Sequence, residues 1–572
     1  MPLSRPSSIK RRTLVKGIAA SSLLPLLGAN LVGCSGNNDN SSGGVPAGFD
    51  HGIASGDPLE DQVIIWTRVT PEREGTVRVR WEVASDEGFA DVVASGSGET
   101  TAEVDYTVKV DIEGLTPGSR YFYRFHTRNS TSATGRTRTL PAGAAAPVTF
   151  AVVSCSNYPA GYFNVYREIA GQELDAVLHL GDYLYEYPRD GYASARAQEF
   201  GREVEPPTEL YSLADYRTRY GQYRGDANLQ AAHAAHPFIA VWDDHEVAND
   251  AWREGAQNHD PETEGSFSER KAAAIQAWYE WLPVRPPAGA REMIYRQFRY
   301  GEMVDLIMLD TRLIGRDRQY TQAEFAPGGV LDVAAARAAF DDSNRTLLGG
   351  EQLQWLQGRL TDSTARWQVL GQQVLFGRYW LPAPVLESLD PGIGGDFNAG
   401  VAAVLAAVQA KTKPAEERTP EEQALLDSAL PYNPDAWDGY GFERDAILEY
   451  ARQLGSNLVV LAGDTHNAWA SQLTTADGQL AGVEFGGTSV SSPGLEDLLG
   501  QDNARLFGPM VTTLVDDLRF ANLFSRGYLH LVFSDSAVTA SYRFVTTVDS
   551  PEYALDAAEG REFTVAAGNL TL

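Results

Sequence analysis

Four short runs of this sequence carry side-chain types that bind metal ions. The runs are 154–157 (Ser-Cys-Ser-Asn), 179–186 (His-Leu-Gly-Asp-Tyr-Leu-Tyr-Glu), 242–250 (Trp-Asp-Asp-His-Glu-Val-Ala-Asn-Asp) and 463–467 (Gly-Asp-Thr-His-Asn). Adjacent carboxylates such as Asp243 and Asp244 repel each other unless a cation neutralises them. A single zinc ion would favour three or four His or Cys ligands, whereas these runs supply mostly carboxylates, with one thiol, one phenol and one or two imidazoles. They therefore predict at least two metal ions of unlike character, one accepting thiolate and phenolate and one preferring oxygen.

Each run follows an apolar stretch that the sequence predicts to be a buried strand. The predicted strands are 148–153, 176–180, 238–242, 304–309, 367–370 and 458–461. Continuous apolar runs are typical of strands covered on both faces, as in an α/β or αββα core. Ligand sites of such sheets form beyond the carboxyl ends of the strands, so the four runs are predicted to converge there. Taken singly, each run also fits a turn or a helix cap, because Asp is a good N-cap residue.

The composition excludes several classes of protein. The chain has 572 residues, of which 43% are hydrophobic, and this argues for several folding units and against disorder. Two cysteines exclude a disulfide scaffold. A net charge of −29 argues against a broad nucleic-acid-binding face, which needs a basic surface. An acidic protein that binds anions must therefore obtain positive charge locally, as from metal ions.

The first 33 residues predict an export signal. Basic side chains without any acidic one precede an apolar stretch, 17–33, which is interrupted by Pro25. The alternative is a transmembrane anchor, but a span needs about 20 apolar residues. The string 8–16 (Ser-Ile-Lys-Arg-Arg-Thr-Leu-Val-Lys) resembles a twin-arginine signal.

The sequence that follows the signal resembles a lipobox. In Leu31-Val32-Gly33-Cys34 the cysteine would carry a lipid and become the first residue of the mature chain, and 34–48 would be a polar tether. The sequence therefore predicts export by the twin-arginine machinery and a periplasmic or cell-surface location. Contact with the membrane is expected only through the lipid anchor at Cys34.

The remainder divides by its hydrophobic pattern. Residues 49–142 predict an all-β domain similar to immunoglobulin or fibronectin sandwiches, with a tyrosine-corner pattern at 115–125. Residues 148–548 predict the α/β domain, with a helical insertion over 381–436 that includes a capping box at 419–422. Residues 549–572 form a C-terminal segment.

In combination the motifs resemble a known family. Gly-Asp-x-x-Tyr (181–185), Asp-His-Glu (244–246) and Gly-x-x-His (463–466) resemble the calcineurin-like metallophosphoesterases and purple acid phosphatases. With Leu-Asp-Thr-Arg (309–312) and Trp-Asp-Gly-Tyr (437–440), they are similar to the PhoD-type alkaline phosphatases and phosphodiesterases. The resemblance covers nearly the whole chain. It implies an αββα metallophosphoesterase sandwich over 148–548, preceded by an N-terminal β-sandwich.

The resemblance also implies a set of metal ligands. Asp182 would bridge two metal ions, and Tyr185 and Cys155 would bind a ferric ion. Asp464 stands where the superfamily has a histidine, which implies a hard partner ion such as calcium. The implied cofactors are thus Fe³⁺ and Ca²⁺, and the implied metal ligands are Cys155, Asp182, Tyr185, Asp244, Asn249, Asp464 and His466.

Two residues are expected to act on the substrate. His245 would face the phosphoryl oxygens and hydrogen-bond the transition state or protonate the leaving group. Arg312 is a candidate phosphate clamp, with a structural ion pair as the alternative. Asp243, Glu246 and Asn467 are expected to hold the ligands in orientation.

The predicted activity is the metal-dependent hydrolysis of phosphate monoesters by a metal-bound hydroxide or oxide, as in an alkaline phosphatase. The first alternative is a phosphodiesterase or phospholipase-D-like enzyme that uses the same site. The second is a non-catalytic, metal-binding surface protein, an alternative kept open by the leading β-domain. The expected partner is a phosphate ester substrate, and the sequence makes no prediction of the oligomeric state.

Overall fold

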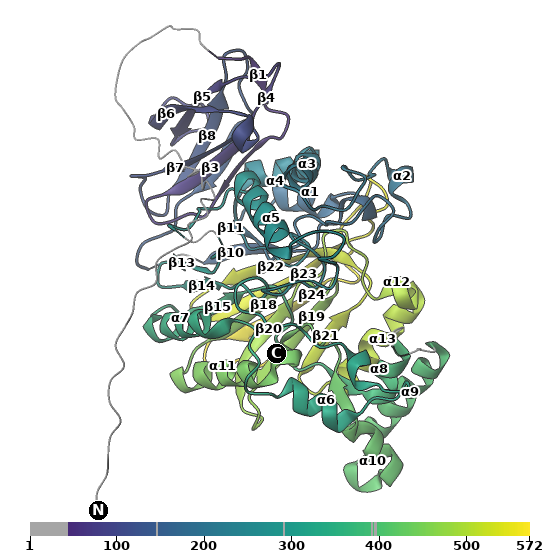
Figure 1. Ribbon diagram of the computed structural model, residues 1–572. Helices are drawn as coiled ribbons and strands as arrows, with labels where there is room; N and C mark the ends of the chain where they lie inside the picture. The colour runs from purple at the N-terminus through teal and green to yellow at the C-terminus, as the bar shows by residue number, and fades with distance from the viewer. Residues whose placement is uncertain (1–43, 145–146, 290–291, 390–392, 394–396) are drawn as a thin grey trace, which may run out of the picture.

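The computed structural model describes residues 44–144, 147–289, 292–389, 393 and 397–572. The predicted signal (1–33), Cys34 and most of the 34–48 tether lie outside the described residues. Two large sheets pack face to face at the centre of the molecule, with helices on both outer faces (Figure 1). This arrangement confirms the expected αββα core.

The first sheet has nine strands. In spatial order they are β24 (Arg561–Ala566), β23 (Ala537–Val545), β22 (Arg526–Phe533), β10 (Val148–Val153), β11 (Ala176–His179), β12 (Pro237–Ala240), β2 (Ile53–Gly56), β3 (Val63–Arg68) and β7 (Thr107–Ile112). The strands β10, β11 and β12 run parallel. Val152 of β10 lies opposite Leu178 of β11, which lies opposite Ile239 of β12. Because they are parallel, their carboxyl ends meet at one edge of the sheet.

The second sheet has seven strands. In spatial order they are β13 (Arg296–Tyr300), β14 (Val304–Met308), β15 (Trp367–Gly371), β18 (Leu458–Ala462), β20 (Leu480–Gly486), β19 (Ala468–Thr474) and β21 (Leu518–Asn522). Its inner face shares one buried cluster with the first sheet, in which Val459 and Phe485 belong to the same core as Phe150 and Leu178. The apolar side chains between the two sheets therefore form one continuous buried layer that holds the sheets together.

Helices cover the outer faces of both sheets. The first sheet is covered by α1 (Asn164–Ala170), α3 (Leu213–Arg224), α4 (Ala227–Ala235) and α5 (Phe267–Trp281), and the second by α6 (Val333–Phe340), α7 (Gly349–Asp362) and α11 (Gly441–Leu454). Helix α13 (Gln501–Leu514) packs on β21 of the second sheet, and two short helices, α2 (Ala197–Phe200) and α12 (Glu496–Leu499), lie outside these layers. Leu356 of α7 and Leu448 of α11 are completely buried against the second sheet.

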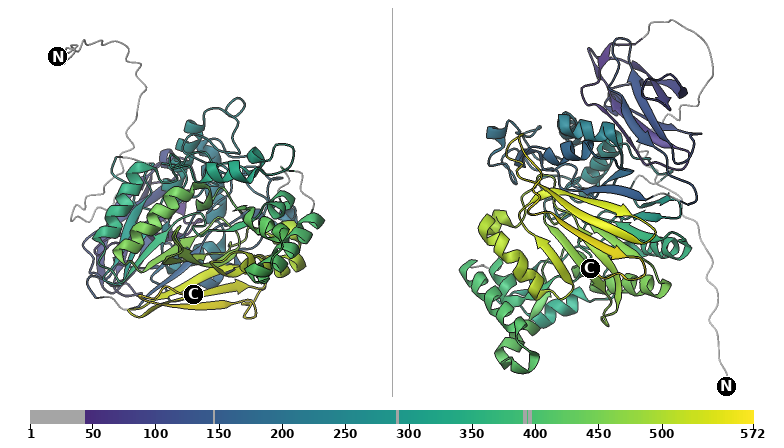
Figure 2. Two further views of the ribbon diagram at one scale, coloured as in Figure 1. Left: turned by 90° about the horizontal axis from the view of Figure 1, so that it is seen from below. Right: turned by 180° about the vertical axis from the view of Figure 1, so that it is seen from behind.

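An all-β domain stands at the top of the molecule, at the purple end of the chain (Figure 1, and from behind in Figure 2). Its four-stranded sheet consists of β6 (Val92–Thr100), β5 (Val77–Ala84), β8 (Arg120–His126) and β9 (Gly135–Arg138), while β1 (Ala47–Gly48) pairs with β4 (Thr70–Pro71). This sheet packs on β3 and β7 through a separate buried cluster. The hydroxyl of Tyr121 accepts the Thr116 N–H at 2.8 Å, which is the hydrogen bond of a tyrosine corner.

The all-β domain and the core share one sheet. Strand β2 pairs in parallel with β12, with Gly56 opposite Phe238, and antiparallel with β3. The Asp57 N–H donates to the Phe238 carbonyl, and the Asp57 carboxylate binds Arg296 of β13 at 2.7 Å. The backbone hydrogen bonding therefore runs without a break from the sandwich into the core.

A group of helices projects from the core at the lower right of Figure 1. It begins and ends at a two-stranded ribbon, β16 (Trp380–Pro382) with β17 (Ala429–Pro431), and contains α8 (Ala383–Leu389), α9 (Phe397–Thr412) and α10 (Pro420–Asp427). The capping box at the start of α10 is confirmed, because Thr419 and Glu422 each accept a hydrogen bond from the backbone N–H of the other.

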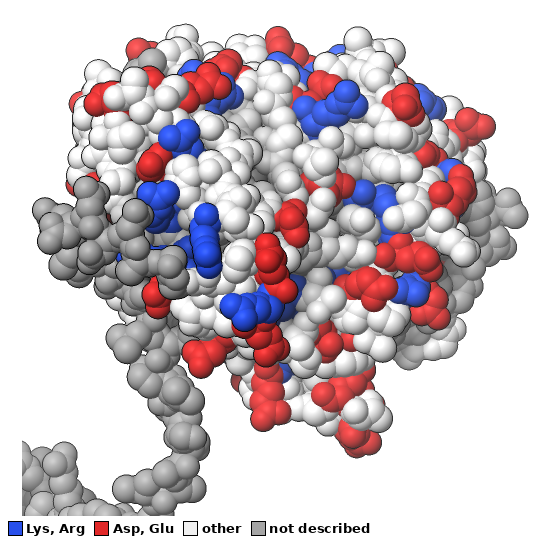
Figure 3. Space-filling model, turned by 90° about the horizontal axis from the view of Figure 1, so that it is seen from above, with Lys and Arg blue, Asp and Glu red and all other residues white. Residues whose placement is uncertain are grey.

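The surface seen from above mixes acidic and basic side chains (Figure 3). Within the described parts of the chain, no helix is both long and apolar enough to cross a membrane.

Candidate metal centre

The four polar runs meet beyond the carboxyl ends of β10, β11, β12 and β18. Four of the predicted metal ligands in them have left-handed backbone angles, with φ of 61° at Cys155, 54° at Asp182, 61° at Asp464 and 58° at His466. Residues other than glycine rarely adopt such angles, and each instance costs about 1–3 kcal/mol. This strain turns the four side chains out of their strands and toward a common point.

Gly181 allows the loops after β11 and β12 to come together. Its φ is 107°, and a Cβ atom at this position would lie 2.3 Å from the Asp243 Cβ. No other residue can occupy the position without displacing Asp243. The Gly-Asp pair of the motif thus places Asp182 beside Asp243 and Asp244.

One group of donor atoms combines sulfur, oxygen and nitrogen. Ligand atoms of Cys155, Asp182 and His466 all lie within 4.8 Å of one another. The Tyr185 hydroxyl lies 3.0 Å from the Asp182 Oδ2 and 3.0 Å from the His466 Nε2. His466 donates its Nδ1–H to the Pro493 carbonyl at 2.8 Å, so Nε2 is the nitrogen that points into the group. Burial lowers the pKa of His466 to about 3, and the imidazole is therefore neutral, as a metal ligand must be.

Two further groups consist mainly of carboxylates. Asp182, Asp244 and His245 form one, and Asp243, Asp244 and Asp464 form the other. Three buried oxygens, the Asp182 Oδ1, the Asp243 Oδ2 and the Asp244 Oδ1, have no hydrogen-bond partner among the described residues. Burial raises the pKa of Asp182 and of Asp243, and it raises that of Asp464 to about 7. Unpartnered buried carboxylates are costly, so the donor set fits cations that would neutralise them.

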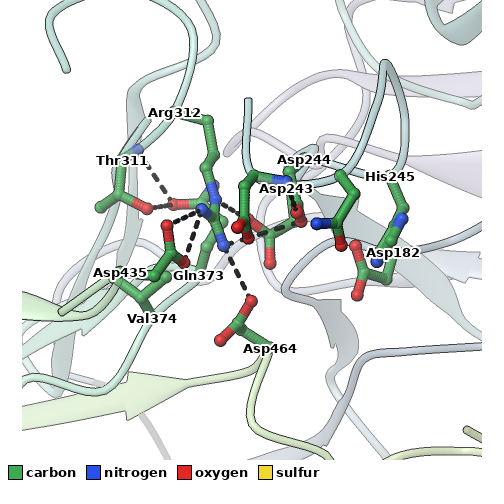
Figure 4. Close-up of polar contacts among 12 residues, drawn as sticks. Asp182, Asp243, Asp244, His245, Thr311, Arg312, Gln373, Val374, Asp435 and Asp464 are labelled. Carbon is green, nitrogen blue, oxygen red and sulfur yellow. Dashed lines mark hydrogen bonds and ion pairs between the residues drawn. The ribbon is translucent and has the colours of Figure 1, made fainter. Parts of the chain in front are cut away.

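Arg312 lies among these carboxylates and is completely buried (Figure 4). Its Nη1 donates to the Asp435 Oδ2 at 2.7 Å and its Nη2 to the Asp464 Oδ1 at 2.8 Å, while its Nε donates to Asp243. All of its nitrogens therefore face protein carboxylates, which is the arrangement expected of a structural ion pair. The role of phosphate clamp stays a prediction.

His245 is held by a carboxylate on its far side. Its Nδ1–H donates to the Glu186 Oε2 at 2.7 Å. Glu186 is completely buried and also accepts the Asn249 N–H at 2.8 Å and the Asn258 Nδ2–H at 3.2 Å. Burial opposes the charged form of His245, but Asp244, Glu186 and Asp182 outweigh it and raise the His245 pKa well above its usual value. The bond from Nδ1 to Glu186 leaves the Nε2 of His245 for a substrate.

Further residues hold the loops that carry the ligands. Glu246 accepts the N–H groups of Asp182 at 3.0 Å and Asp243 at 2.6 Å, which ties two loops together. The Asn467 Oδ1 accepts the Leu495 N–H at 3.2 Å. The side chain of Asn249 donates to the Gln257 Oε1 at 3.0 Å, and its role as a metal ligand stays a prediction.

Sequence reasoning missed three carboxylates of this centre, two of them buried and one, Asp250, half-buried. Glu186 closes the 179–186 run, Asp250 closes the 242–250 run, and Asp435 lies just before the 437–440 motif. Asp250 has a left-handed φ of 53°, and its N–H donates to the Asp244 Oδ2 at 2.6 Å. Their place within the motifs was a visible signal, but their partners are distant in sequence.

Comparisons with known proteins agree over almost the whole chain. Residues 150–542 match the family described as PhoD-like phosphatase, and residues 36–141 match its N-terminal domain. The chain is similar to alkaline phosphatase D of Bacillus subtilis (strain 168), with 36% identity over 531 residues that cover 89% of this chain and 79% of the relative. It also resembles a solved structure of PhoD, with a TM-score of 0.72, 33% identity, and coverage of 93% of this chain and 92% of the other.

Proposed function

The chain belongs to the PhoD-like phosphatase family and is a metal-dependent phosphoric ester hydrolase, and we propose that it hydrolyses phosphate monoesters with iron and calcium as its cofactors. The observation that carries this proposal is the convergence of a thiol, a phenol, an imidazole and several carboxylates around Asp182 and Asp244. One buried oxygen each of Asp182, Asp243 and Asp244 has no hydrogen-bond partner among the described residues. The chemistry of this site, and not the fold alone, supports this function.

The two kinds of donor set suggest two different cations. Cys155, Asp182, Tyr185 and His466 would hold the ferric ion, since thiolate, phenolate and imidazole suit a transition metal. Asp244 and Asp464, with Asp182 and an oxygen of Asn249, would hold the calcium ion, which prefers oxygen ligands. Asp243 adds an unpartnered oxygen close to this second set.

When bound, such a pair of cations supplies the Lewis acidity that polarises a phosphoryl group and makes water a better nucleophile at neutral pH. The residues of the chain supply the proton. Glu186 fixes the His245 ring through Nδ1, and His245 donates from Nε2 to the oxygen of the departing alcohol. Glu186, which is not among the assigned metal ligands, favours the charged form of His245 before that transfer. No serine nucleophile is required.

The metal assignment is tested by mass-spectrometric metal analysis together with visible absorption. Ferric thiolate and phenolate bonds should colour the protein, and a colourless, iron-free protein with full activity would refute the iron assignment. Replacement of Asp182 by alanine (Asp182→Ala) should remove metal and activity together. Retention of activity in this variant would exclude Asp182 from the centre of the mechanism.

The alternative of diester hydrolysis is tested on the same preparation. A monoester and a diester with the same leaving group, such as p-nitrophenyl phosphate and bis-p-nitrophenyl phosphate, should be assayed side by side. We expect a higher kcat/KM for the monoester. A preference for the diester would favour the phosphodiesterase alternative with the same site.

We also propose that the protein is exported by the twin-arginine route and anchored by a lipid on Cys34. The basic string 8–16 and the sequence 31–34 support this proposal, and both lie outside the described residues. Replacement of Arg11 and Arg12 by lysine should retain the protein inside the cell, and Cys34→Ala should release it from the membrane fraction. Normal fractionation of both variants would contradict the proposal.

A further inference from the structure

Three tyrosines of one loop, Tyr185, Tyr187 and Tyr192, form an aromatic wall beside the metal centre. The ring of His245 lies 4.2 Å from that of Tyr185 and 5.3 Å from that of Tyr187, measured between centroids. The ring of Tyr192 lies 6.1 Å from that of His466 and 5.9 Å from that of Tyr187. The wall therefore passes along both histidines of the site.

Tyr187 differs from the other two tyrosines in its hydroxyl. The Tyr185 hydroxyl is buried among the ligand atoms, and the Tyr192 hydroxyl donates to the Pro493 carbonyl at 3.1 Å. Tyr187 is half-buried, and within the described residues its hydroxyl makes no hydrogen bond. Neither a ligand role nor an internal hydrogen bond accounts for this ring.

The loop nevertheless holds Tyr187 firmly. The buried guanidinium of Arg219 donates to the Tyr187 carbonyl at 3.1 Å and also to the Tyr185 carbonyl. Gly191 lets the loop fold closely, because a Cβ there would lie 2.7 Å from the Tyr187 Cβ. A ring that is fixed before binding loses little entropy when a ligand packs on it.

The orientation of His245 indicates which part of the substrate lies beside the Tyr187 ring. Because Nδ1 is bonded to Glu186, the proton for the departing alcohol comes from Nε2. The alcohol oxygen must therefore lie next to the His245 ring, and the organic group attached to it must leave the centre along a neighbouring surface. Tyr187 is the half-buried ring within reach of His245.

We propose that Tyr187 determines leaving-group specificity, its ring packing against the organic part of the ester and favouring flat or apolar alcohols next to the phosphate. This inference rests on the proposed function, since it concerns the ester hydrolysed at the same site. Aromatic rings stack on flat groups and pack well against apolar ones, whereas small polar alcohols gain little from such a surface.

The test measures kcat/KM for phenyl phosphate and glycerol phosphate in the metal-loaded enzyme. Tyr187→Ala should lower the value for phenyl phosphate about 3- to 10-fold more than that for glycerol phosphate, as expected for loss of one aromatic contact. Tyr187→Phe should keep the preference, because it keeps the ring. Tyr553→Ala is the matched control, since its hydroxyl donates to Glu168 of α1 and lies outside the site.

The outcomes separate this inference from the proposed function. A wild-type enzyme that hydrolyses neither ester would refute the proposed function itself. A wild-type enzyme active on both, with equal losses in Tyr187→Ala, would overturn the inference alone and assign the ring a structural role. Absence of any loss in Tyr187→Ala would overturn it as well.

Discussion

Replacement of Glu186 by glutamine (Glu186→Gln) tests whether the proton of His245 is used in the reaction. The change keeps the shape of the side chain and removes one buried charge. The amide oxygen can still accept from the Asn249 N–H and the Asn258 amide, which lie 2.8 and 3.2 Å from the carboxylate. The new NH₂ group must then face the His245 Nδ1, which can only accept from it.

The magnitude follows from that reversal. A ring whose Nδ1 accepts a hydrogen bond is neutral, so His245 loses the imidazolium that Glu186 helps to stabilise. General acid catalysis contributes about 10²- to 10⁴-fold. We therefore expect kcat for glycerol phosphate to fall about 100-fold or more, equivalent to about 3 kcal/mol of barrier. For p-nitrophenyl phosphate the fall should be below about 10-fold, since a nitrophenolate leaves without protonation.

The assay compares kcat for a series of esters whose alcohols differ in pKa, at fixed metal content. Glu209→Gln is the matched control, because Glu209 accepts from Asn258 at 3.1 Å and from Arg270 at 2.7 Å but does not touch His245. It should leave the dependence on the leaving group unchanged. Glu186→Gln should make that dependence steeper.

Two results would refute the reasoning. If Glu186→Gln lowered kcat equally for all leaving groups, Glu186 would position the loop but not the proton. If it lowered none of them, His245 would not act as the acid. The metal content of the variant should be measured on the same samples. Loss of metal would show that Glu186 positions the loop and would explain an equal fall in kcat for all leaving groups.

Three further variants address the scaffold of the centre. In Arg312→Lys the shorter ammonium group cannot reach Asp243, Asp435 and Asp464 together. The free energy of unfolding in urea, measured after a chelator has removed the metal, should therefore fall by about 3 kcal/mol or more. A residue that only clamps phosphate would instead raise KM without this loss of stability. Gly181→Ala should cost about 2–4 kcal/mol and lower the bound metal, because its φ is 107° and its Cβ would meet Asp243; unchanged metal content would contradict the close approach of the loops. Burial raises the pKa of Glu484 from 4.5 to about 7, so the folded protein binds its proton more tightly than the unfolded chain, and its contribution is lost as pH rises from about 4.5 to 7. Glu484→Gln should therefore gain about 3 kcal/mol relative to wild type between those pH values, and parallel stability curves would exclude this titration.

Much of the core could be predicted from local sequence. The expected strands 148–153, 304–309 and 458–461 correspond to β10 (Val148–Val153), β14 (Val304–Met308) and β18 (Leu458–Ala462). Strands buried on both faces have continuous apolar sequences, so their positions can be recognised from the local sequence alone. The convergence of the polar runs then follows from parallel pairing.

The features of the fold and site that the sequence did not predict depend on contacts between residues that are distant in the chain. Arg312 has an ordinary position after a strand, and only the folded chain brings Asp435 and Asp464 to it. Glu186 is part of a motif, yet its bond to His245 spans 59 residues. The pairing of β2 with β12 joins segments separated by about 180 positions, and neither strand carries a local signal for the other.

That pairing has a consequence for the solubility of the enzyme. Without β2, the main chain of β12 would present unpaired N–H and C=O groups next to Phe238 and Ile239, both of which are almost fully buried. An open, apolar strand of this kind is a template for strands of other molecules and a starting point for aggregation. By covering this edge, the N-terminal sandwich protects the catalytic core from aggregation. A truncated chain beginning at residue 148 is expected to associate with itself, which light scattering would detect.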